Sequence, residues 1–248
     1  MKIRVGNKEF SLDDIEDELF AKKILPKCAP NCMATNFGAF DVIYSAYNNI
    51  KYIVENNIPG DIVECGVWKG GIMQLAALTL AALGDTSRSI YLYDTFEGMP
   101  EPGKFDVDWN GNSPHKKWES MQWENITSVG SRFGFGGTLE TVSSVMNETS
   151  YPVDNFVYVK GMVETTIPNI SPSKIAYLRL DTDWYSSTAH ELEHLYPLLS
   201  LGGVLVIDDY GYYKGSRKAT DEYFKKNKVK MLLSRVSHLG VREGVKQK

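Results

Sequence analysis

The sequence predicts an α/β fold in which a mainly parallel β-sheet carries helices on both faces and follows an N-terminal helical segment. The 248 residues are enough for one such domain with a small appendage. Short, continuous apolar segments alternate with segments of helical spacing, which is typical of strands buried between two layers of helices. Two of the apolar segments end abruptly in pairs of acidic residues, which indicates polar chemistry at these strand ends.

The composition is that of a soluble globular protein, with 43% hydrophobic and 23% charged residues. The formal net charge of −4 gives no support for a nucleic-acid-binding surface. The first residues do not read as a signal peptide, and no apolar stretch reaches the ~18–20 residues that a membrane helix needs. Three cysteines suit a reduced compartment better than a disulfide framework. We therefore expect a cytoplasmic protein whose partners include neither nucleic acid nor membrane.

The first 58 residues are expected to be helical and to form a lid or appendage to a catalytic domain at residues 59–248. Residues 11–14 resemble a helix start, with a serine followed by two acidic residues. Apolar residues recur at helical spacing between positions 40 and 54, and Pro59-Gly60 ends that helix.

A series of strand–helix units then follows. The expected strands cover residues 61–65, 89–93, 156–160, 174–180 and 203–207. Helices are expected at residues 71–83, 190–199 and 217–226, followed by a hairpin near residues 230–236 and 240–245. Residues 95–150 form an insert rich in Gly, Trp, Ser and Asn, with a crossover helix at residues 138–146. Because this insert is longer than an ordinary connection, we expect it to contribute to function.

Four aspartates are expected to lie close together at one edge of the sheet. Asp181 and Asp183 follow one strand, and Asp208 and Asp209 follow the next. Carboxylates beside buried strands are costly unless something compensates them, and a hard divalent cation such as Mg²⁺ does so through oxygen ligands. Residues two apart in an extended segment point to the same side, so Asp181 and Asp183 can share a site. The adjacent Asp208 and Asp209 can do so only if their strand has already ended in a turn.

The turn after the first strand has the features of a cofactor site. It runs Glu64-Cys65-Gly66-Val-Trp-Lys-Gly70-Gly71, and its glycines allow the backbone to approach a ligand closely. The spacing differs from G-x-G-x-x-G, which weakens a dinucleotide-binding interpretation. An acidic residue just before the first glycine is instead typical of sites for S-adenosylmethionine.

The ends of the following strands extend this prediction. Asp94 is placed to accept both hydroxyls of a ribose, although it can alternatively cap a turn. Gly161 follows the third strand, where an adenine ring would lie. Arg179 carries a charge inside a strand and is expected to pair with a nearby carboxylate. Trp184 and Tyr185 either form a wall of the acceptor site or pack in the core.

Four segments together resemble the macrocin O-methyltransferase family. They are residues 59–71, Tyr93-Asp-Thr-Phe-Glu-Gly-Met-Pro100, Leu180-Asp-Thr-Asp-Trp-Tyr-Ser-Ser-Thr188 and Leu201-Gly-Gly-Val-Leu-Val-Ile-Asp-Asp-Tyr210. They occur in order, so the resemblance covers most of residues 30–225. It implies a class I, Rossmann-like methyltransferase fold. It also implies an enzyme that uses S-adenosyl-L-methionine and Mg²⁺ to methylate sugar hydroxyls of natural products.

The resemblance implies roles for individual residues as well. Asp181, Asp208 and Asp209 would bind the metal, and Asp183 would be the general base. In that family the N-terminal segment closes over the cofactor, which implies a similar role for residues 33–35. The residues then expected to bind the cofactor are Glu64, Cys65, Gly66, Gly70, Gly71, Asp94, Thr95, Gly161, Met33, Thr35 and Asp181.

Methyl transfer to an aliphatic hydroxyl explains why both a metal and a base are needed. Such a hydroxyl has a pKa near that of water, ~15.7, whereas an ordinary aspartate has a pKa of ~3.9 and is a poor base for it. Mg²⁺ that chelates two neighbouring hydroxyls would lower the pKa of one, and Asp183 could then take its proton. The expected partner is a small-molecule hydroxyl acceptor, a sugar or glycoside. A homo-oligomer is also compatible with the helical appendage and the many aromatic residues.

Other functions fit part of the pattern. A phosphatase of the haloacid-dehalogenase type also has an apolar strand, Asp-x-Asp and a later Asp-Asp on Mg²⁺. Here Tyr185 stands where that class has Thr or Val, the motif lies late in the chain, and there is no room for the intervening lysine motif. A glycosyltransferase that uses Asp-x-Asp leaves the turn at residues 64–71 unexplained. A non-catalytic binding protein with a relict cofactor pocket is a further alternative. The presence of all four acidic residues argues against it.

Overall fold

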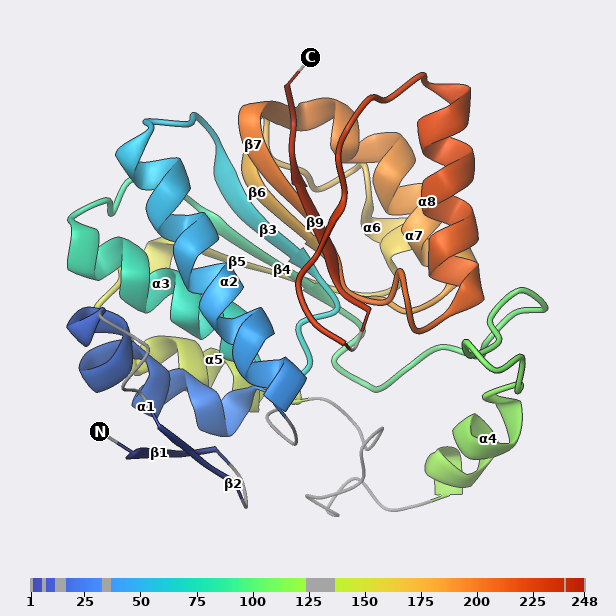
Figure 1. The fold of residues 1–248 in the computed structure, drawn as a ribbon, viewed down its shortest axis with the longest axis horizontal. Helices are drawn as coiled ribbons and strands as arrows, with labels where there is room; N and C mark the ends of the chain where they lie inside the picture. Colours follow the sequence, from blue (N-terminus) through green and yellow to red (C-terminus); the bar gives the residue numbers. More distant parts are fainter. Residues whose placement is uncertain are drawn as a thin grey trace.

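A computed structural model describes residues 2–5, 8–11, 17–32, 37–123, 137–238 and 240–247. Its centre is a seven-stranded sheet in the order β5-β4-β3-β6-β7-β9-β8 (Figure 1). The parallel strands are β3 (Asp61–Cys65), β4 (Ile90–Asp94), β5 (Phe156–Lys160), β6 (Ile175–Leu180) and β7 (Leu199–Ile207). The last two strands, β8 (Ser234–Arg235) and β9 (Arg242–Val245), pair in antiparallel fashion, and β9 also pairs with β7. The predicted α/β fold with a mainly parallel sheet is confirmed.

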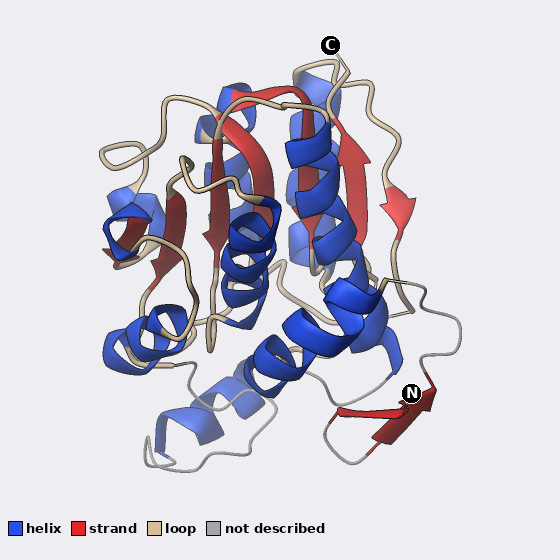
Figure 2. Ribbon diagram, turned by 90° about the vertical axis from the view of Figure 1, so that its left-hand side faces the viewer, coloured by secondary structure: helices blue, strands red, loops and turns tan. Residues whose placement is uncertain are grey.

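Helices cover both faces of this sheet (Figure 2). One face carries α2 (Phe37–Glu55), α3 (Gly71–Leu83) and α5 (Leu139–Asn147), and the other carries α6 (Val163–Thr166), α7 (Tyr185–His194) and α8 (Lys214–Lys226). The two hydrophobic clusters follow the two-residue period of the strands. In β3, Ile62 belongs to the first cluster, whereas Val63 and Cys65 belong to the second.

The N-terminal region differs from its prediction, which was wrong in treating the first 58 residues as helical throughout. β1 (Lys2–Val5) and β2 (Lys8–Ser11) form an antiparallel hairpin, and Ser11 ends β2 instead of starting a helix. The missed signal is local: Val5 pairs with Lys8, and residues 2–5 alternate between basic and apolar residues, as a strand does. The remainder of the predicted helix start, residues 12–14, lies outside the described residues.

The following turns, η1 (Phe20–Ile24), α1 (Leu25–Cys28) and η2 (Ala29–Asn31), are helical and join the same hydrophobic cluster as α2 and α3. Within the insert the structure adds α4 (His115–Trp123), which was not predicted. The predicted crossover helix is present as α5, where Thr138 Oγ1 accepts a hydrogen bond from Thr141 N (3.2 Å) as an N-cap. The short helices η3 (Val153–Asn155) and η4 (Tyr196–Leu198) precede β5 and β7.

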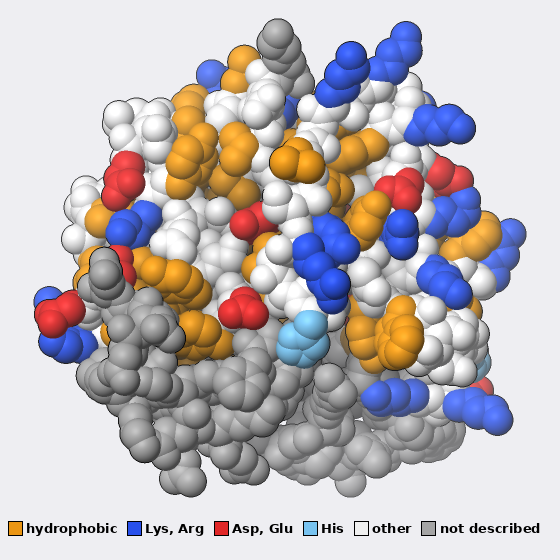
Figure 3. Space-filling model, in the orientation of Figure 1, with side chains coloured by type: hydrophobic (Ala, Val, Ile, Leu, Met, Phe, Trp, Pro, Cys, Tyr) orange, Lys and Arg blue, Asp and Glu red, His pale blue; other side chains and the backbone are white. Residues whose placement is uncertain are grey.

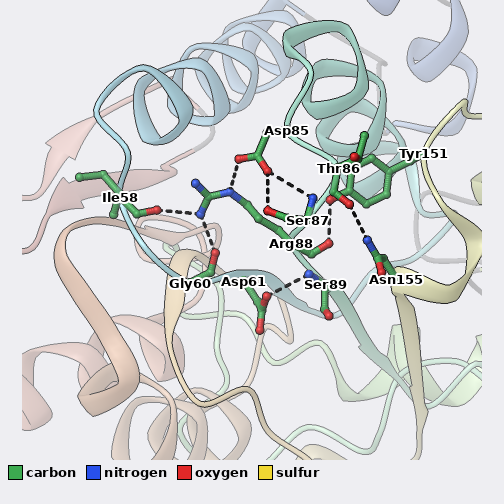
Figure 4. Close-up of polar contacts among 10 residues, drawn as sticks. All are labelled: Ile58, Gly60, Asp61, Asp85, Thr86, Ser87, Arg88, Ser89, Tyr151 and Asn155. Atoms are coloured by element: carbon green, nitrogen blue, oxygen red, sulfur yellow. Dashed lines mark hydrogen bonds and ion pairs between the residues drawn. The ribbon is translucent and has the colours of Figure 1, made fainter.

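Arg88 ties the loops together at the amino ends of the strands (Figure 4). Its Nη1 donates to the carbonyl oxygens of Ile58 (2.7 Å) and Gly60 (2.6 Å), and its Nε pairs with Asp85 (2.6 Å). At the start of β3, Asp61 Oδ1 accepts from Ser89 N (2.9 Å). At this edge of the sheet the polar groups named here bond to one another. The polar residues predicted to be functional lie at the opposite edge, where the strands have their carboxyl ends.

On the face shown in Figure 3, basic side chains lie mainly on the side of α8 and are interspersed with acidic and hydrophobic ones. Among the helices that the structure describes, none combines the length and hydrophobicity needed to cross a membrane.

Candidate active site

The turns after β3 and β6 meet at the carboxyl edge of the sheet. Asp181 N donates to Cys65 O (2.8 Å), and Gly66 N donates to Tyr93 O (2.8 Å). Gly66 has a φ of +84°, and a Cβ at this position would lie 2.1 Å from Asp181 O. Only glycine therefore lets the predicted cofactor turn lie directly against the turn that carries the first aspartates.

Three of the aspartates converge, as their places at neighbouring strand ends predicted. One carboxylate oxygen from each of Asp181, Asp208 and Asp209 lies within 4.8 Å of the others. β7 ends at Ile207, and the amides of Tyr212 and Tyr213 both donate to Asp209 O (3.0 Å each). Because the strand has already become a turn, adjacent carboxylates can face one point. This meets the condition for the proposed metal set, while metal binding itself stays a prediction.

Asp183 joins this cluster from an unusual backbone conformation. Its φ is +67°, which is uncommon for a residue other than glycine and typically occurs where function requires it. Its side chain hydrogen-bonds to Asp209. Burial raises the pKa of Asp183 well above its usual range, and the neighbouring Asp181 carboxylate adds to this effect. A hydrogen bond between two carboxyl groups requires one shared proton, while the role of Asp183 as general base stays a prediction.

Arg179 supplies positive charge to the cluster, which confirms the prediction that it pairs with a carboxylate. Arg179 is 5% exposed. Nη1 lies 2.6 Å from Glu64 Oε1 and also bonds Asp181, while Nη2 bonds Asp208. One buried cation therefore links the predicted cofactor turn to two of the predicted metal ligands.

The carboxyl group of Asp94 holds two turns in place. Oδ2 accepts from Val67 N (2.9 Å) and Trp68 N (3.1 Å), and Oδ1 accepts from Phe96 N (2.8 Å). In this structure Asp94 thus acts as the turn cap that we considered as the alternative. Its contact with a ribose stays a prediction.

The other predicted cofactor residues surround the same turns. Gly70 has a φ of +79° and precedes α3, and Gly161 N donates to Asp94 O (2.9 Å). Thr95 Oγ1 donates to Gly98 O (2.6 Å). The Cys65 side chain is fully buried in the second hydrophobic cluster, which leaves only its backbone near the edge. Met33, Ala34 and Thr35 lie outside the described residues.

Sequence reasoning missed the part of the insert that reaches the site. Trp184 is 3% exposed, packs against Tyr213 with ring centroids 4.9 Å apart, and donates from Nε1 to Pro100 O (2.9 Å). Of the two roles considered for Trp184, the structure therefore supports core packing. Asp106 Oδ1 accepts from Tyr185 N (2.7 Å) across 79 positions of sequence. No local pattern marks such a distant contact.

Comparisons with known proteins point to one family. The family model described as macrocin-O-methyltransferase matches residues 41–242. A tetracenomycin-C 4'-O-methyltransferase from Streptomyces olivaceus, which acts on a rhamnosyl derivative by its name, is 31% identical over 198 residues, 78% of this chain and 70% of that protein. Mycinamicin III 3''-O-methyltransferase from Micromonospora griseorubida is 29% identical over 198 residues, 78% of this chain and 73% of that protein.

Solved structures are similar as well. The O-methyltransferase NovP superposes with a TM-score of 0.71 at 26% identity, covering 84% of this chain and 80% of NovP. A calicheamicin methyltransferase shares the fold, with a TM-score of 0.60 at 18% identity and coverage of 93% of this chain and 86% of that one. The family model and these relatives are named as methyltransferases, so the phosphatase and glycosyltransferase alternatives are not retained. Since the family model spans most of the chain, the chain belongs to the macrocin O-methyltransferase family and is a methyltransferase.

Proposed function

We propose that this chain transfers a methyl group from S-adenosyl-L-methionine to a hydroxyl of a sugar or glycosylated natural product, with Mg²⁺ bound by Asp181, Asp208 and Asp209. The main support is the convergence of these three carboxylates within 4.8 Å, beside the glycine-rich turn at residues 66–71. The names of the relatives support the acceptor class, because they specify methylation of a rhamnosyl derivative of tetracenomycin C and of mycinamicin III.

The donor atoms fit a magnesium ion. The three side chains offer only carboxylate oxygens, which hard divalent cations prefer. Among the described residues, Asp209 Oδ2 is buried and has no hydrogen-bond partner, so it is available to a ligand. Asp181, Asp208 and Asp209 would hold the ion. When bound, it would chelate two neighbouring acceptor hydroxyls and lower the pKa of one of them.

The turn after β3 fits a cationic cofactor. Glu64 is 1% exposed, and its Oε2 lacks a hydrogen-bond partner within the described part of the chain. A buried carboxylate oxygen in this position would favour a ligand that carries positive charge, as S-adenosylmethionine does. At Gly66 and Gly71 the space that a Cβ would take is filled by the backbones of Asp181 and Asn31, so these glycines let the turn pack closely against its neighbours in the fold.

The position of η2 supports the proposed lid role of the N-terminal segment. A Cβ at Gly71 would lie 2.5 Å from the carbonyl atoms of Asn31, so η2 rests directly on the start of α3. Asn31 Nδ2 also donates to Gln74 Oε1 (2.9 Å). The chain therefore enters residues 33–36 from a point beside the cofactor turn, which supports a contact of Met33 and Thr35 with the cofactor.

Asp183 would act as the general base. The acceptor oxygen attacks the methyl carbon while Asp183 takes the hydroxyl proton, and the carbon–sulfur bond breaks with its electron pair staying on sulfur. The products are the methyl ether, S-adenosylhomocysteine and a protonated carboxyl group. The raised pKa of Asp183 makes this carboxylate a better proton acceptor than an exposed aspartate.

A panel of vicinal-diol acceptors, with glycosides and sugar-free polyphenols side by side, tests this function. Purified protein is incubated with S-adenosylmethionine, Mg²⁺ and each acceptor, and mass spectrometry detects the gain of one methyl group. EDTA should abolish the gain and added Mg²⁺ should restore it. Methyl transfer that continues in excess EDTA would rule out the metal mechanism, whereas transfer only to acceptors without a sugar would rule out the acceptor class.

A further inference from the structure

Asp106 is a buried carboxylate in the insert that neither the metal set nor the cofactor turn includes. It is 2% exposed. Oδ1 accepts from Tyr185 N (2.7 Å), and Oδ2 accepts from Gly103 N (2.7 Å). Burial of a carboxylate is costly without such partners. The two backbone amides therefore compensate the burial of Asp106.

The Tyr185 contact completes the start of α7. Tyr185 is the first residue of this helix, and the preceding Trp184 makes no side-chain capping hydrogen bond. The first amides of a helix lack partners within it and favour a negative charge. Asp106 supplies both from the insert, so it fixes where α7 begins and thereby the turn that carries Asp183, two residues before Tyr185.

α8 is shaped to admit this carboxylate. A Cβ at Gly215 would lie 1.9 Å from Asp106 Oδ1 and 3.1 Å from Tyr185 N. No side chain fits at this position without displacing the hydrogen bond. Gly215 therefore allows α8 to pack directly over the contact between Asp106 and Tyr185.

The same segment also contacts the second acidic turn. We call residues 99–108 the insert brace. Its Val107 O accepts from Lys214 N (2.9 Å), and Asp108 forms an isolated antiparallel bridge with Tyr213. Tyr213 N in turn donates to Asp209 O (3.0 Å). The insert brace thus contacts the chain shortly after Asp183 and again shortly after Asp209.

We propose that Asp106 is a positioning residue for methyl transfer: it holds the turn bearing Asp183 against the turn bearing Asp208 and Asp209. The left-handed backbone of Asp183 persists only where its surroundings enforce it. Trp184 N closes the turn locally by donating to Thr182 O (2.8 Å), and the bond from Tyr185 N to Asp106 ties the end of this turn to the insert. This inference rests on the proposed function, because it takes Asp183 to be the general base.

Three variants and one control test the proposal. Asp106→Ala removes both hydrogen bonds, Asp106→Asn keeps an oxygen acceptor, and Gly215→Ala displaces the carboxylate without changing it. Asp61→Asn is the matched control, because Asp61 also accepts from a backbone amide, Ser89 N (2.9 Å), but at the opposite edge of the sheet (Figure 4). Urea unfolding of each variant shows that it is folded and measures its loss of stability.

Hydrogen–deuterium exchange gives a readout that does not depend on activity. We expect exchange of peptides covering residues 182–188 to accelerate by roughly tenfold or more in Asp106→Ala and Gly215→Ala, and not in Asp61→Asn. Unchanged exchange in both site variants would overturn the proposal even if the chain methylates no tested acceptor. The test of the brace therefore stands apart from the test of the function.

Steady-state kinetics with an acceptor found in the panel of vicinal-diol acceptors completes the test. We expect kcat to fall roughly 10–100-fold in Asp106→Ala and Gly215→Ala, with the KM for S-adenosylmethionine within about twofold of the wild type. Asp106→Asn should recover part of kcat. If Asp106→Ala and Asp61→Asn are equally stable and have equal kcat values, Asp106 has only a structural role. That result would overturn the proposal.

Discussion

The guanidinium of Arg179 lies 2.6 Å from Glu64 Oε1 and at the same time bonds the carboxylates of Asp181 and Asp208. The cofactor turn and the proposed metal ligands therefore share one buried cation. When all three carboxylates are ionised, their negative charge exceeds the single positive charge of Arg179. A divalent cation would neutralise the excess. In the structure Arg179 is the counter-charge that Glu64, Asp181 and Asp208 share.

Replacing Arg179 with methionine should strongly destabilise the protein, because it leaves buried carboxylates without a counter-charge. We expect a loss of about 3–5 kcal/mol in the free energy of unfolding, measured with urea. Added Mn²⁺ should recover part of that loss by taking the place of the missing charge.

Arg88→Met is the matched control for this prediction. Arg88 is also largely buried and paired with an aspartate, but at the amino edge of the sheet (Figure 4). It should lose about 1–3 kcal/mol, since its carbonyl and carboxylate partners lose a donor, and it should not respond to Mn²⁺. An Arg179→Met variant as stable as the wild type would disprove the balancing role.

Asp183→Asn tests the base directly. The amide keeps the shape of the side chain but cannot take a proton, so kcat should fall roughly 10²–10⁴-fold. Affinity for S-adenosylhomocysteine, measured by calorimetry, should stay within about twofold because Asp183 is outside the predicted cofactor contacts. The exposed Asp154→Asn serves as control and should retain full activity. Comparable kcat values for the two variants would remove Asp183 from the base role.

Asp94→Ala tests the cofactor turn. The variant loses the acceptor for the amides of Val67, Trp68 and Phe96, as well as the predicted contact with the ribose. Affinity for S-adenosylhomocysteine should fall roughly tenfold or more, since each lost hydrogen bond to a charged group is worth about 1.5–3 kcal/mol. A variant that loses stability but binds S-adenosylhomocysteine normally would leave Asp94 as a turn cap alone.

What could be predicted from the sequence was local in origin. The strands were predictable because a buried parallel strand appears in the sequence as a short run of apolar residues. The aspartates were predictable because they directly follow such runs. α7 begins at Tyr185, before the predicted position 190, because its first turn depends on Asp106 from the insert. The hairpin at residues 2–11 carried a strand signal that the nearby helical pattern obscured. Contacts such as Arg179 with Glu64 needed the sheet order before they could be named.

Glu191 should make the stability of the protein depend on pH. Its side chain is fully buried in α7, and Oε1 accepts from Thr182 Oγ1 (2.8 Å). Burial raises the pKa of Glu191 to about 8, above the ordinary value of 4.5 that it regains on unfolding. Between these values the folded state keeps a proton that the unfolded state releases. The free energy of unfolding should therefore fall as pH rises through this window.

Glu191→Gln removes this dependence, because glutamine keeps the acceptor oxygen and has no proton to lose. Relative to the wild type, the variant should gain on the order of 1–3 kcal/mol in stability between pH 5 and pH 8, measured by urea unfolding at each pH. The exposed Glu148→Gln is the control and should show no such gain. Parallel pH profiles for wild type and Glu191→Gln would mean that Glu191 is ionised in the folded protein. The hydrogen bond from Thr182 Oγ1 would then be the contact that stabilises the charged form.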